Sequence, residues 1–227
     1  MKKEKCCLLI GNTRWHWATQ TNNQWIFTHE APNIQTLKEL TIPLIKWAAV
    51  GPIPKDYALD PSKSIQTTDV PILKTPKWIG VDRALAGWGA FQKAKSKKLH
   101  SKGILVADAG TILSLNIISP NGEFAGGQLI AGLQLQRSSM STRAEKLRSV
   151  ISKELPNNEF PMSTEQAMLK GSFNALLCTL LAMQRETNIP LWLCGGDSKI
   201  LFEHLKNRSC DVYHYPNLAI EALTQIK

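Results

Sequence analysis

The sequence predicts a mixed α/β protein built from two lobes. Its 227 residues can form one large domain or two lobes of about 100 residues each. Strand patterns at 6–10, 14–19 and 24–29, separated by Gly-Asn-Thr and Thr-Asn-Asn turns, predict a β-meander. A second meander is predicted after Ile104, and strands alternate with helices beyond it.

The remaining elements follow the same α/β order. A helix is expected near 34–40, a buried strand at 47–50 ended by Gly-Pro, and a helix from about Asp82 after a Pro-rich connection. The later elements are expected as strands at 104–107, 112–118, 123–129 and 191–194, and helices at 164–184, 197–206 and 217–226.

These elements suggest a boundary between the two meanders. We expect an N-terminal lobe at 1–103 and a C-terminal lobe at 104–227. Aligning Gly11 with Gly110 places the turn after the first strand of one meander on the corresponding turn of the other. The repeat is weak, but it falls on the residues that carry the candidate chemistry.

Composition indicates a folded protein of the cytoplasm. Hydrophobic residues make up 43% and charged residues 20%, without a low-complexity tract. The apolar stretch 175–183 is too short to cross a bilayer, and only a short apolar run follows the basic first five residues, so we expect neither a membrane span nor secretion. The five cysteines show no metal-ligand spacing and are expected to be reduced core residues.

The net charge of +9 allows several partners: nucleic acid, a membrane surface or an anionic small substrate. Part of it comes from four lysines, at positions 93, 95, 97 and 98, near the end of a predicted helix, where cations favour the helix dipole and stay solvated. Tryptophans could stack on bases, but no RNA-binding motif surrounds them, and core or interface packing is the simpler interpretation for Trp15, Trp17 and Trp78. We expect neither nucleic acid nor membrane as a partner.

The segment Asp108-Ala109-Gly110-Thr111 is a candidate phosphate turn. A strand that ends in a Gly-Thr turn presents backbone N–H groups and a hydroxyl to phosphate oxygens, while an adjacent Asp holds the accompanying cation. Alone, the pattern is equally typical of an ordinary hairpin. The Gly11-Asn12-Thr13 turn offers the same chemistry in the first lobe.

The segment from Gly80 to Arg83 is a candidate substrate site at the start of a helix. Asp82 could take a proton from an attacking hydroxyl, and Arg83 could hold a substrate carboxylate through two hydrogen bonds. Asp82 could equally serve only as a helix cap. Thr164 is similarly open, because Ser163 and Gln166 around it can form a capping box.

Glycine pairs mark further positions of interest. Gly126-Gly127, followed by Gly132, would let the backbone approach a neighbour or a ligand closely, or would mark a bulge and the entry to a helix. A Gly195-Gly196 turn follows the predicted strand at 191–194.

Taken in order, these motifs resemble those of type III pantothenate kinases over nearly the whole chain. The most specific stretch is DAGTILSLNIISPNGEFAGGQLIAG at 108–132, and Gly-Val-Asp-Arg at 80–83 adds independent weight. The resemblance implies an actin-like fold of two RNase H-like lobes in the acetate-and-sugar-kinase and Hsp70 superfamily. It also implies a cytoplasmic homodimer that phosphorylates pantothenate with ATP, the first step of coenzyme A biosynthesis.

The same resemblance assigns roles to individual residues. Asp82 would be the proton acceptor, and Asp108 would bind the monovalent cation, K⁺ or NH₄⁺, with Mg²⁺ accompanying ATP. The pantothenate site would comprise Gly80, Val81, Asp82, Arg83 and Thr164. The ATP site would comprise Leu9, Ile10, Gly11, Asn12, Thr13, Arg14, Trp15, His16 and Thr111.

Four positions depart from the family pattern. Its first turn reads Asp-x-Gly-Asn-Thr-x-x-Lys, whereas this chain has Leu9 and His16 at the two charged positions. Asn116 replaces an acid, and Leu73 replaces a tyrosine. An alternative is therefore a catalytically impaired relative that acts as a pantothenate-binding or regulatory protein.

Overall fold

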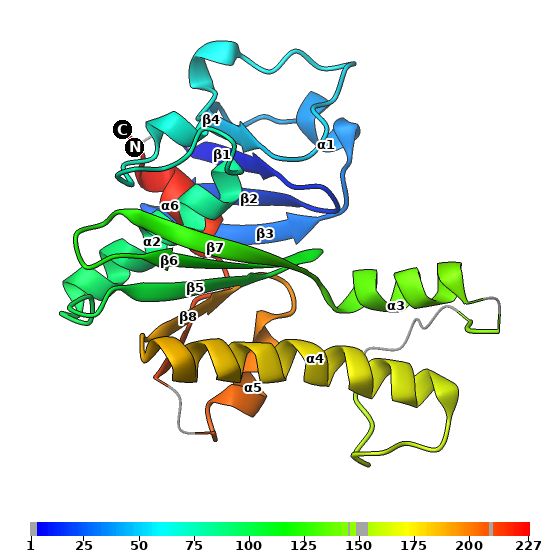
Figure 1. Ribbon diagram of the computed structural model, residues 1–227. Helices are drawn as coiled ribbons and strands as arrows, with labels where there is room; N and C mark the ends of the chain where they lie inside the picture. Colours follow the sequence, from blue (N-terminus) through cyan, green and yellow to red (C-terminus); the bar gives the residue numbers. More distant parts are fainter. Residues whose placement is uncertain (1–3, 145, 149–153, 209–210) are drawn as a thin grey trace. The chain divides into compact units, whose positions relative to one another are not determined.

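The computed structural model describes most of the chain, and Figure 1 shows its helices and strands. The described residues are 4–144, 146–148, 154–208 and 211–227.

The chain forms two compact units that interleave along the sequence. The first comprises Met1–Val106, Asn116–Gly126 and Asn217–Lys227, and the second comprises Ala107–Leu115 and Gly127–Pro216. The predicted boundary at residue 103 remains a prediction about lobe organisation. In the structure, the C-terminal segment Asn217–Lys227 and the segment Asn116–Gly126 of the second meander belong to the first compact unit.

A four-stranded sheet organises the first unit, in the order β3-β2-β1-β4. Its strands are β1 (Lys5–Ile10), β2 (Trp15–Thr21), β3 (Gln24–Glu30) and β4 (Leu44–Ala49). The three strands of the meander are antiparallel, and β4 lies parallel to β1. The β2–β3 turn places Asn22 and Asn23 at positive φ, which favours a tight hairpin.

The register of this sheet places two altered positions side by side. Leu9 on β1 lies directly opposite His16 on β2, which in turn lies opposite His29 on β3. Cross-strand partners have neighbouring side chains, so a change at one position alters the environment of the other. Leu9 and His16 are therefore direct neighbours across the β1–β2 pair.

Helices cover the first sheet and complete its core (Figure 1). They are α1 (Ile34–Lys38), α2 (Val81–Ser96) and α6 (Leu218–Gln225), with short 3₁₀ turns at Pro61–Lys63 and Thr67–Asp69. Helices α2 and α6 pack closely, because a Cβ at Gly89 would lie 3.0 Å from the carbonyl oxygen of Leu218. The last helix of the chain is therefore part of the N-terminal fold.

The remaining strands form a five-stranded sheet in the order β7-β6-β5-β8-β9. They are β5 (Ile104–Ala109), β6 (Ile112–Ile118), β7 (Phe124–Ala131), β8 (Leu191–Cys194) and β9 (Val212–His214). Three helices belong to the second unit: α3 (Leu133–Arg143), α4 (Thr164–Thr187) and α5 (Ser198–Leu205). Helix α4 runs beside α3 and also contacts α5 (Figure 1).

The structure corrects several sequence predictions. Helix α3 and strand β9 were not predicted, and β4 begins at Leu44, three residues before its predicted start. Cys178 is exposed rather than part of the core, and Cys210 lies outside the described residues. Trp78 is 75% exposed and is therefore not packed in a core. Among the described residues, no helix combines the length and apolar character that a membrane span requires.

Candidate active-site residues in each unit

The first candidate phosphate turn is built tightly at the end of β1. The Gly11 N–H donates a hydrogen bond to the Arg14 carbonyl at 2.9 Å, closing the turn. Gly51, just after β4, packs against it so closely that a Cβ there would lie 2.1 Å from the Gly11 carbonyl oxygen. The N–H of Gly51 also donates to the Ile10 carbonyl at 3.1 Å. The turn is thus supported by the end of the neighbouring parallel strand.

The side chains around this turn divide into core residues and exposed residues. Leu9, Ile10 and Trp15 are buried in the hydrophobic core, so only their backbone groups could reach a nucleotide. The predicted members Asn12, Thr13 and Arg14 are exposed, and His16 is half-buried. Backbone amides with small polar side chains are the groups that a phosphate turn presents.

Asp82 lies in the first turn of α2, where Gly80 is the N-cap. Its Oδ1 accepts a hydrogen bond from the backbone N–H of Arg83 at 2.7 Å. A Cβ at Gly80 would lie 2.5 Å from that same oxygen and 3.3 Å from Cγ1 of Val50. Val50 lies beside Gly80, and the next residue, Gly51, packs against the Gly11 turn. The start of α2 and the Gly11 turn therefore lie on either side of the Val50-Gly51 pair within the first unit.

The environment of Asp82 favours a proton acceptor. Burial raises the pKa of its carboxyl group, and the hydrogen bond from Arg83 together with the Arg83 charge offsets part of that rise. A carboxylate with a raised pKa binds a proton more readily than an exposed one. The helix-cap interpretation of Asp82 is wrong, because Gly80 is the N-cap and α2 has no side-chain cap bond. Oδ1 of Asp82 is bonded to the Arg83 N–H in the first helical turn, and the carboxylate has a second oxygen that can take a proton.

Arg83 is held by Asn116, at a position where the resemblance leads one to expect an acid. Its Nε and Nη2 both donate to Oδ1 of Asn116, at 3.0 Å and 2.6 Å, and Asn116 is 1% exposed. The guanidinium carries five N–H donors, so its remaining edge can still bind a carboxylate. A neutral amide fixes the orientation of Arg83 without neutralising its positive charge.

The second candidate phosphate turn connects β5 and β6 within the second unit. Here a Cβ at Gly132 would lie 2.1 Å from the Gly110 carbonyl oxygen. The Gly132 N–H donates a hydrogen bond to the backbone carbonyl of Thr111 at 2.9 Å. Gly195, at φ +91°, packs on the other flank, where a Cβ would lie 2.4 Å from Oδ1 of Asp108. Both positions require glycine, and the expected close backbone approach is confirmed at Gly132.

Gly126 differs from these two positions. Nothing lies within 4 Å of the place that a Cβ would occupy, so no close approach requires glycine there. Its φ of +119° marks a backbone irregularity in β7.

Asp108 is the candidate cation ligand in this turn. Its carboxyl group is half-buried, and no group of three or more His, Cys, Asp or Glu side chains within the described ranges is arranged to hold a metal. A cation that keeps several waters and binds nucleotide phosphates needs only one or two protein carboxylates. Asp108 therefore offers a single protein carboxylate to a cation at this turn.

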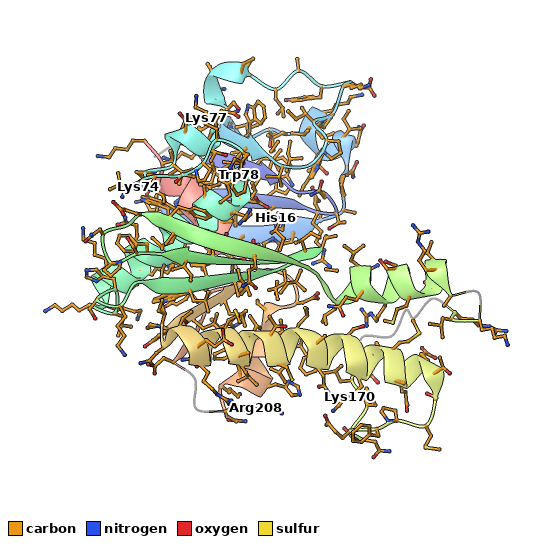
Figure 2. All side chains as sticks on the ribbon, viewed as in Figure 1. His16, Lys74, Lys77, Trp78, Lys170 and Arg208 are labelled. Carbon is orange, nitrogen blue, oxygen red and sulfur yellow. The ribbon has the colours of Figure 1, made fainter. Side chains whose placement is uncertain are left out.

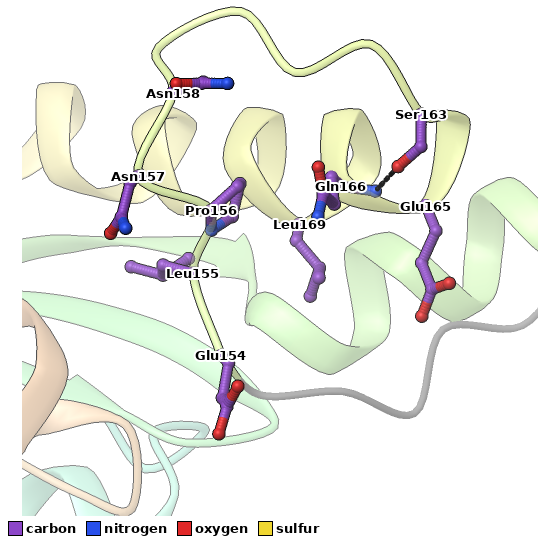
Figure 3. Close-up of a pocket in the computed structure, with 9 residues that line it drawn as sticks. All are labelled: Glu154, Leu155, Pro156, Asn157, Asn158, Ser163, Glu165, Gln166 and Leu169. Atoms are coloured by element: carbon purple, nitrogen blue, oxygen red, sulfur yellow. Dashed lines mark hydrogen bonds between the residues drawn. The ribbon is translucent and has the colours of Figure 1, made fainter.

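Thr164 is the first residue of α4, and its side chain is exposed. Ser163 before it caps the helix, since its Oγ accepts the N–H of Gln166 at 3.3 Å. A pocket of about 540 Å³ opens beside this helix start (Figure 3). It is lined by Glu154, Leu155, Pro156, Asn157, Asn158, Ser163, Glu165, Gln166 and Leu169. Its described lining includes the carboxylates of Glu154 and Glu165 but no Lys, Arg or His side chain. The pocket is therefore a poor match for an anionic substrate.

Two contributors to the site were not predicted from the sequence. Gly51 was interpreted only as the end of a strand, and Asn116 only as a lost acid. The repeat that aligns Gly11 with Gly110 could have located Gly51. Gly51, after β4, supports the Gly11 turn, and Gly195, after β8, supports the Gly110 turn in the same way. The Arg83–Asn116 bond joins residues 33 positions apart and has no local signal.

Similar solved structures define the class of protein. One is a putative Baf family transcriptional activator from Campylobacter jejuni, with a TM-score of 0.63, 17% identity, and coverage of 97% of this chain and 96% of that one. Another is the activator of 2-hydroxyisocaproyl-CoA dehydratase from Clostridium difficile, with a TM-score of 0.54, 10% identity, and coverage of 98% and 95%. The fold is that of the actin-like ATPases and related kinases, as the sequence predicted.

Sequence comparisons then define the family within this class. The profile of type III pantothenate kinases matches residues 61–185, more than half of the chain. Type III pantothenate kinases from Thermosynechococcus vestitus and Synechococcus elongatus are each 27% identical to it. The alignments cover 95% of this chain and 88% of the first relative, and 96% and 94% for the second. The chain belongs to the type III pantothenate kinase family.

Proposed function

We propose that this protein phosphorylates pantothenate with ATP to give 4′-phosphopantothenate and ADP, the first step of coenzyme A biosynthesis. The observation that carries this proposal is the half-buried Asp82 carboxylate, whose pKa burial raises and which lies in the same compact unit as the Gly11 turn. Family membership supports the choice of substrates, and the raised pKa of Asp82 supports its choice as the base.

Asp82 acts as the proton acceptor in this proposal. The primary hydroxyl oxygen of pantothenate forms a bond to the γ-phosphorus of ATP, while the bond from that phosphorus to the bridging oxygen of ADP breaks. The hydroxyl proton passes to the carboxylate of Asp82. The raised pKa of Asp82 matches this role, since it increases the proton affinity of the base.

Arg83 binds the carboxylate of pantothenate. Asn116 already orients its guanidinium through two hydrogen bonds, which lowers the entropy lost when substrate binds. Asp82 and Arg83 are adjacent in the chain, so together they suit a substrate that carries both a hydroxyl and a carboxylate. The N-terminal end of α2, with Gly80 and Val81, provides backbone N–H groups beside them. Thr164 is a further pantothenate contact by its position in the family pattern.

The two phosphate turns bind ATP. In the first unit, the backbone groups from Leu9 to His16 bind ATP. In the second unit, Thr111 binds it. Asp108 is the candidate ligand of a monovalent cation, K⁺ or NH₄⁺, with Mg²⁺ on the nucleotide. A bound cation would offset negative charge on the transferring phosphoryl group. We also propose that the protein acts in the cytoplasm as a homodimer, as the family pattern implies.

The experiment that tests this function supplies purified protein with Mg-ATP and pantothenate, with and without K⁺. Phosphopantothenate is detected by mass spectrometry, and a pantothenate amide that lacks the carboxylate is the comparison substrate. We expect product from pantothenate, less without K⁺, and a KM for the amide at least about tenfold higher, because Arg83 loses a charged partner.

The possible results separate kinase from binding protein. Folded protein whose melting temperature rises with pantothenate, yet which forms no product, would support a non-catalytic relative and contradict the kinase. Equal turnover of pantothenate and its amide would remove Arg83 from the substrate site while leaving the kinase intact.

A further inference from the structure

A row of three side chains crosses the first unit beside the Gly11 turn. His16, near the start of β2 (Figure 2), places its Nδ1 2.7 Å from Nδ1 of His29 on β3. His29 Nε2 then lies 2.8 Å from Oδ1 of Asn217, the N-cap residue of α6. All three side chains belong to the same compact unit.

The hydrogen bonds in this row have only one consistent direction when both imidazoles are neutral. Asn217 Oδ1 can only accept, so His29 Nε2 carries the hydrogen. A neutral His29 then has a bare Nδ1, to which the Nδ1–H of His16 donates. His16 Nε2 is therefore left without a hydrogen.

This bare nitrogen faces the candidate phosphate turn. His16 Nε2 lies 3.4 Å from the position that a Cβ on Gly11 would occupy. Phosphate oxygens are acceptors, so a bare nitrogen beside them gives no hydrogen bond. The lysine of the family pattern at this position is always charged, whereas His16 can donate to a phosphate only after it gains a proton.

The surroundings keep His16 neutral before an anion arrives. Burial is the main cause that lowers the pKa of His16 to about 4, and the positive charge of Arg14 acts in the same direction. A doubly charged phosphate group next to the ring would act in the opposite direction, because an opposite charge favours the protonated imidazole.

Two acids on the neighbouring elements have other partners. Glu30, beside His29 on β3, accepts the indole N–H of Trp17 at 2.7 Å. On α6, Glu221 binds Lys93 of α2 at 2.6 Å. From β1 the residue facing His16 is the apolar Leu9, where the family pattern has an acid. The strand pair therefore offers His16 an apolar neighbour in place of a counter-charge.

We propose that His16, oriented by His29 and Asn217, takes up a proton when a nucleotide phosphate binds the Gly11 turn. This inference rests on the proposed nucleotide binding. In this proposal His29 and Asn217 are positioning residues of the nucleotide site. Leu9 and His16 together replace the charged pair of the family pattern, so that the positive charge at position 16 is present only when His16 is protonated. Nucleotide affinity then falls as pH rises.

Calorimetry of Mg-ATP binding tests the proton uptake directly. Binding is measured from about pH 5.5 to about pH 8 in two buffers with different ionisation enthalpies, for the wild type and for His16→Lys. The ionisation of ATP itself is common to both proteins. A second control is His204→Gln, on α5 of the other unit.

We expect the wild type and His204→Gln to take up as much as about one proton more per ATP than His16→Lys. Their Kd should rise by up to about tenfold per pH unit, beyond the slope shown by His16→Lys. Equal proton uptake in the wild type and His16→Lys would overturn the histidine proposal and leave nucleotide binding standing. Binding by neither protein at any pH, with both folded, would overturn both.

The tautomer can be tested without nucleotide. Long-range ¹H–¹⁵N NMR of the free wild type should show His16 protonated at Nδ1 and His29 at Nε2. In Asn217→Ala, which leaves His29 Nε2 without its acceptor, the His16 Nδ1–H signature should weaken. A His16 ring protonated at Nε2 in the free wild type would overturn the proposal, because that nitrogen could then donate to phosphate without proton uptake.

Discussion

Asp82 combines a structural cost with the proposed catalytic role. Its folded-state pKa is raised, so the stability linked to its protonated form is present below the ordinary carboxyl pKa and is lost as pH rises through the folded-state value. At neutral pH the ionised, half-buried carboxylate therefore lowers stability. An amide of the same shape avoids that cost.

We predict that Asp82→Asn lowers kcat by roughly 10²–10⁴-fold while the melting temperature at pH 7 stays the same or rises. Thermal unfolding at pH 4 and pH 7, followed by circular dichroism, should show a larger gain over the wild type at pH 7. A clear drop in melting temperature at pH 7 would indicate that the Asp82 carboxylate mainly stabilises the first turn of α2 through its bond to the Arg83 N–H.

Asn116 shows what residue-level sequence reasoning misses. From the sequence it was interpreted only as a lost acid, whereas the structure shows it holding Arg83 with both hydrogen bonds to one oxygen. The motif residues themselves were predictable because turns and caps have local patterns. The partner of Arg83 depends on which strand packs beside α2.

We predict that Asn116→Ala raises the KM for pantothenate by about 10–100-fold with a smaller change in kcat, because a buried hydrogen bond to a charged group contributes about 1.5–3 kcal/mol. Steady-state kinetics of the two parameters check this split. Asn174→Ala, which removes an exposed bond between Asn174 and Glu159 on the other unit, is the control and should leave both unchanged.

At the scale of elements, the strands and long helices follow from local pattern. Strands β6 and β8 match their predicted bounds because apolar runs end at turn residues. Helix α3 was missed because its sequence, LQLQRSSMSTR, carries three serines and one buried residue, Leu133. Strand β9 has only three half-buried residues and forms by pairing with β8. Tertiary contacts, rather than propensity, specify both elements.

The glycine after each supporting strand gives a prediction at this scale. Gly51→Ala should weaken Mg-ATP binding at least about tenfold, because its Cβ would overlap the Gly11 carbonyl oxygen and push the phosphate turn out of place. Calorimetry measures the affinity, and thermal unfolding reports any loss of stability.

The matched control is Gly171→Ala in α4, where nothing lies within 4 Å of a Cβ. Alanine in a helix interior should raise stability by about 0.5–1 kcal/mol and leave ATP affinity unchanged. Equal effects of the two substitutions would mean that Gly51 does not support the turn.

At the scale of the whole molecule, the C-terminal segment completes the N-terminal fold. Helix α6 packs on α2, Glu221 binds Lys93, and Lys46 donates to the carbonyl of Ile226. Sequence order alone assigned this helix to the second lobe. Because the pairing depends on contacts far apart in the chain, local patterns could not reveal it.

We predict that deleting residues 217–227 destabilises the first unit severely, because buried faces of α2 and of the first sheet lose their cover. Urea unfolding monitored by tryptophan fluorescence should show a lower midpoint or no cooperative transition. The milder Glu221→Gln should cost about 1 kcal/mol or less, since its ion pair is only partly buried. A truncated chain as stable as the full one would contradict the assignment of α6 to this unit.

The central claim is that Asp82 accepts the proton while the rest of the site binds substrate. The most direct test measures phosphopantothenate formation and pantothenate binding on the same preparations of wild type and Asp82→Asn. The account predicts product from the wild type and, in the variant, binding within about threefold of the wild type with product formation reduced roughly 10²-fold or more. Product formation at the wild-type rate in Asp82→Asn would contradict it.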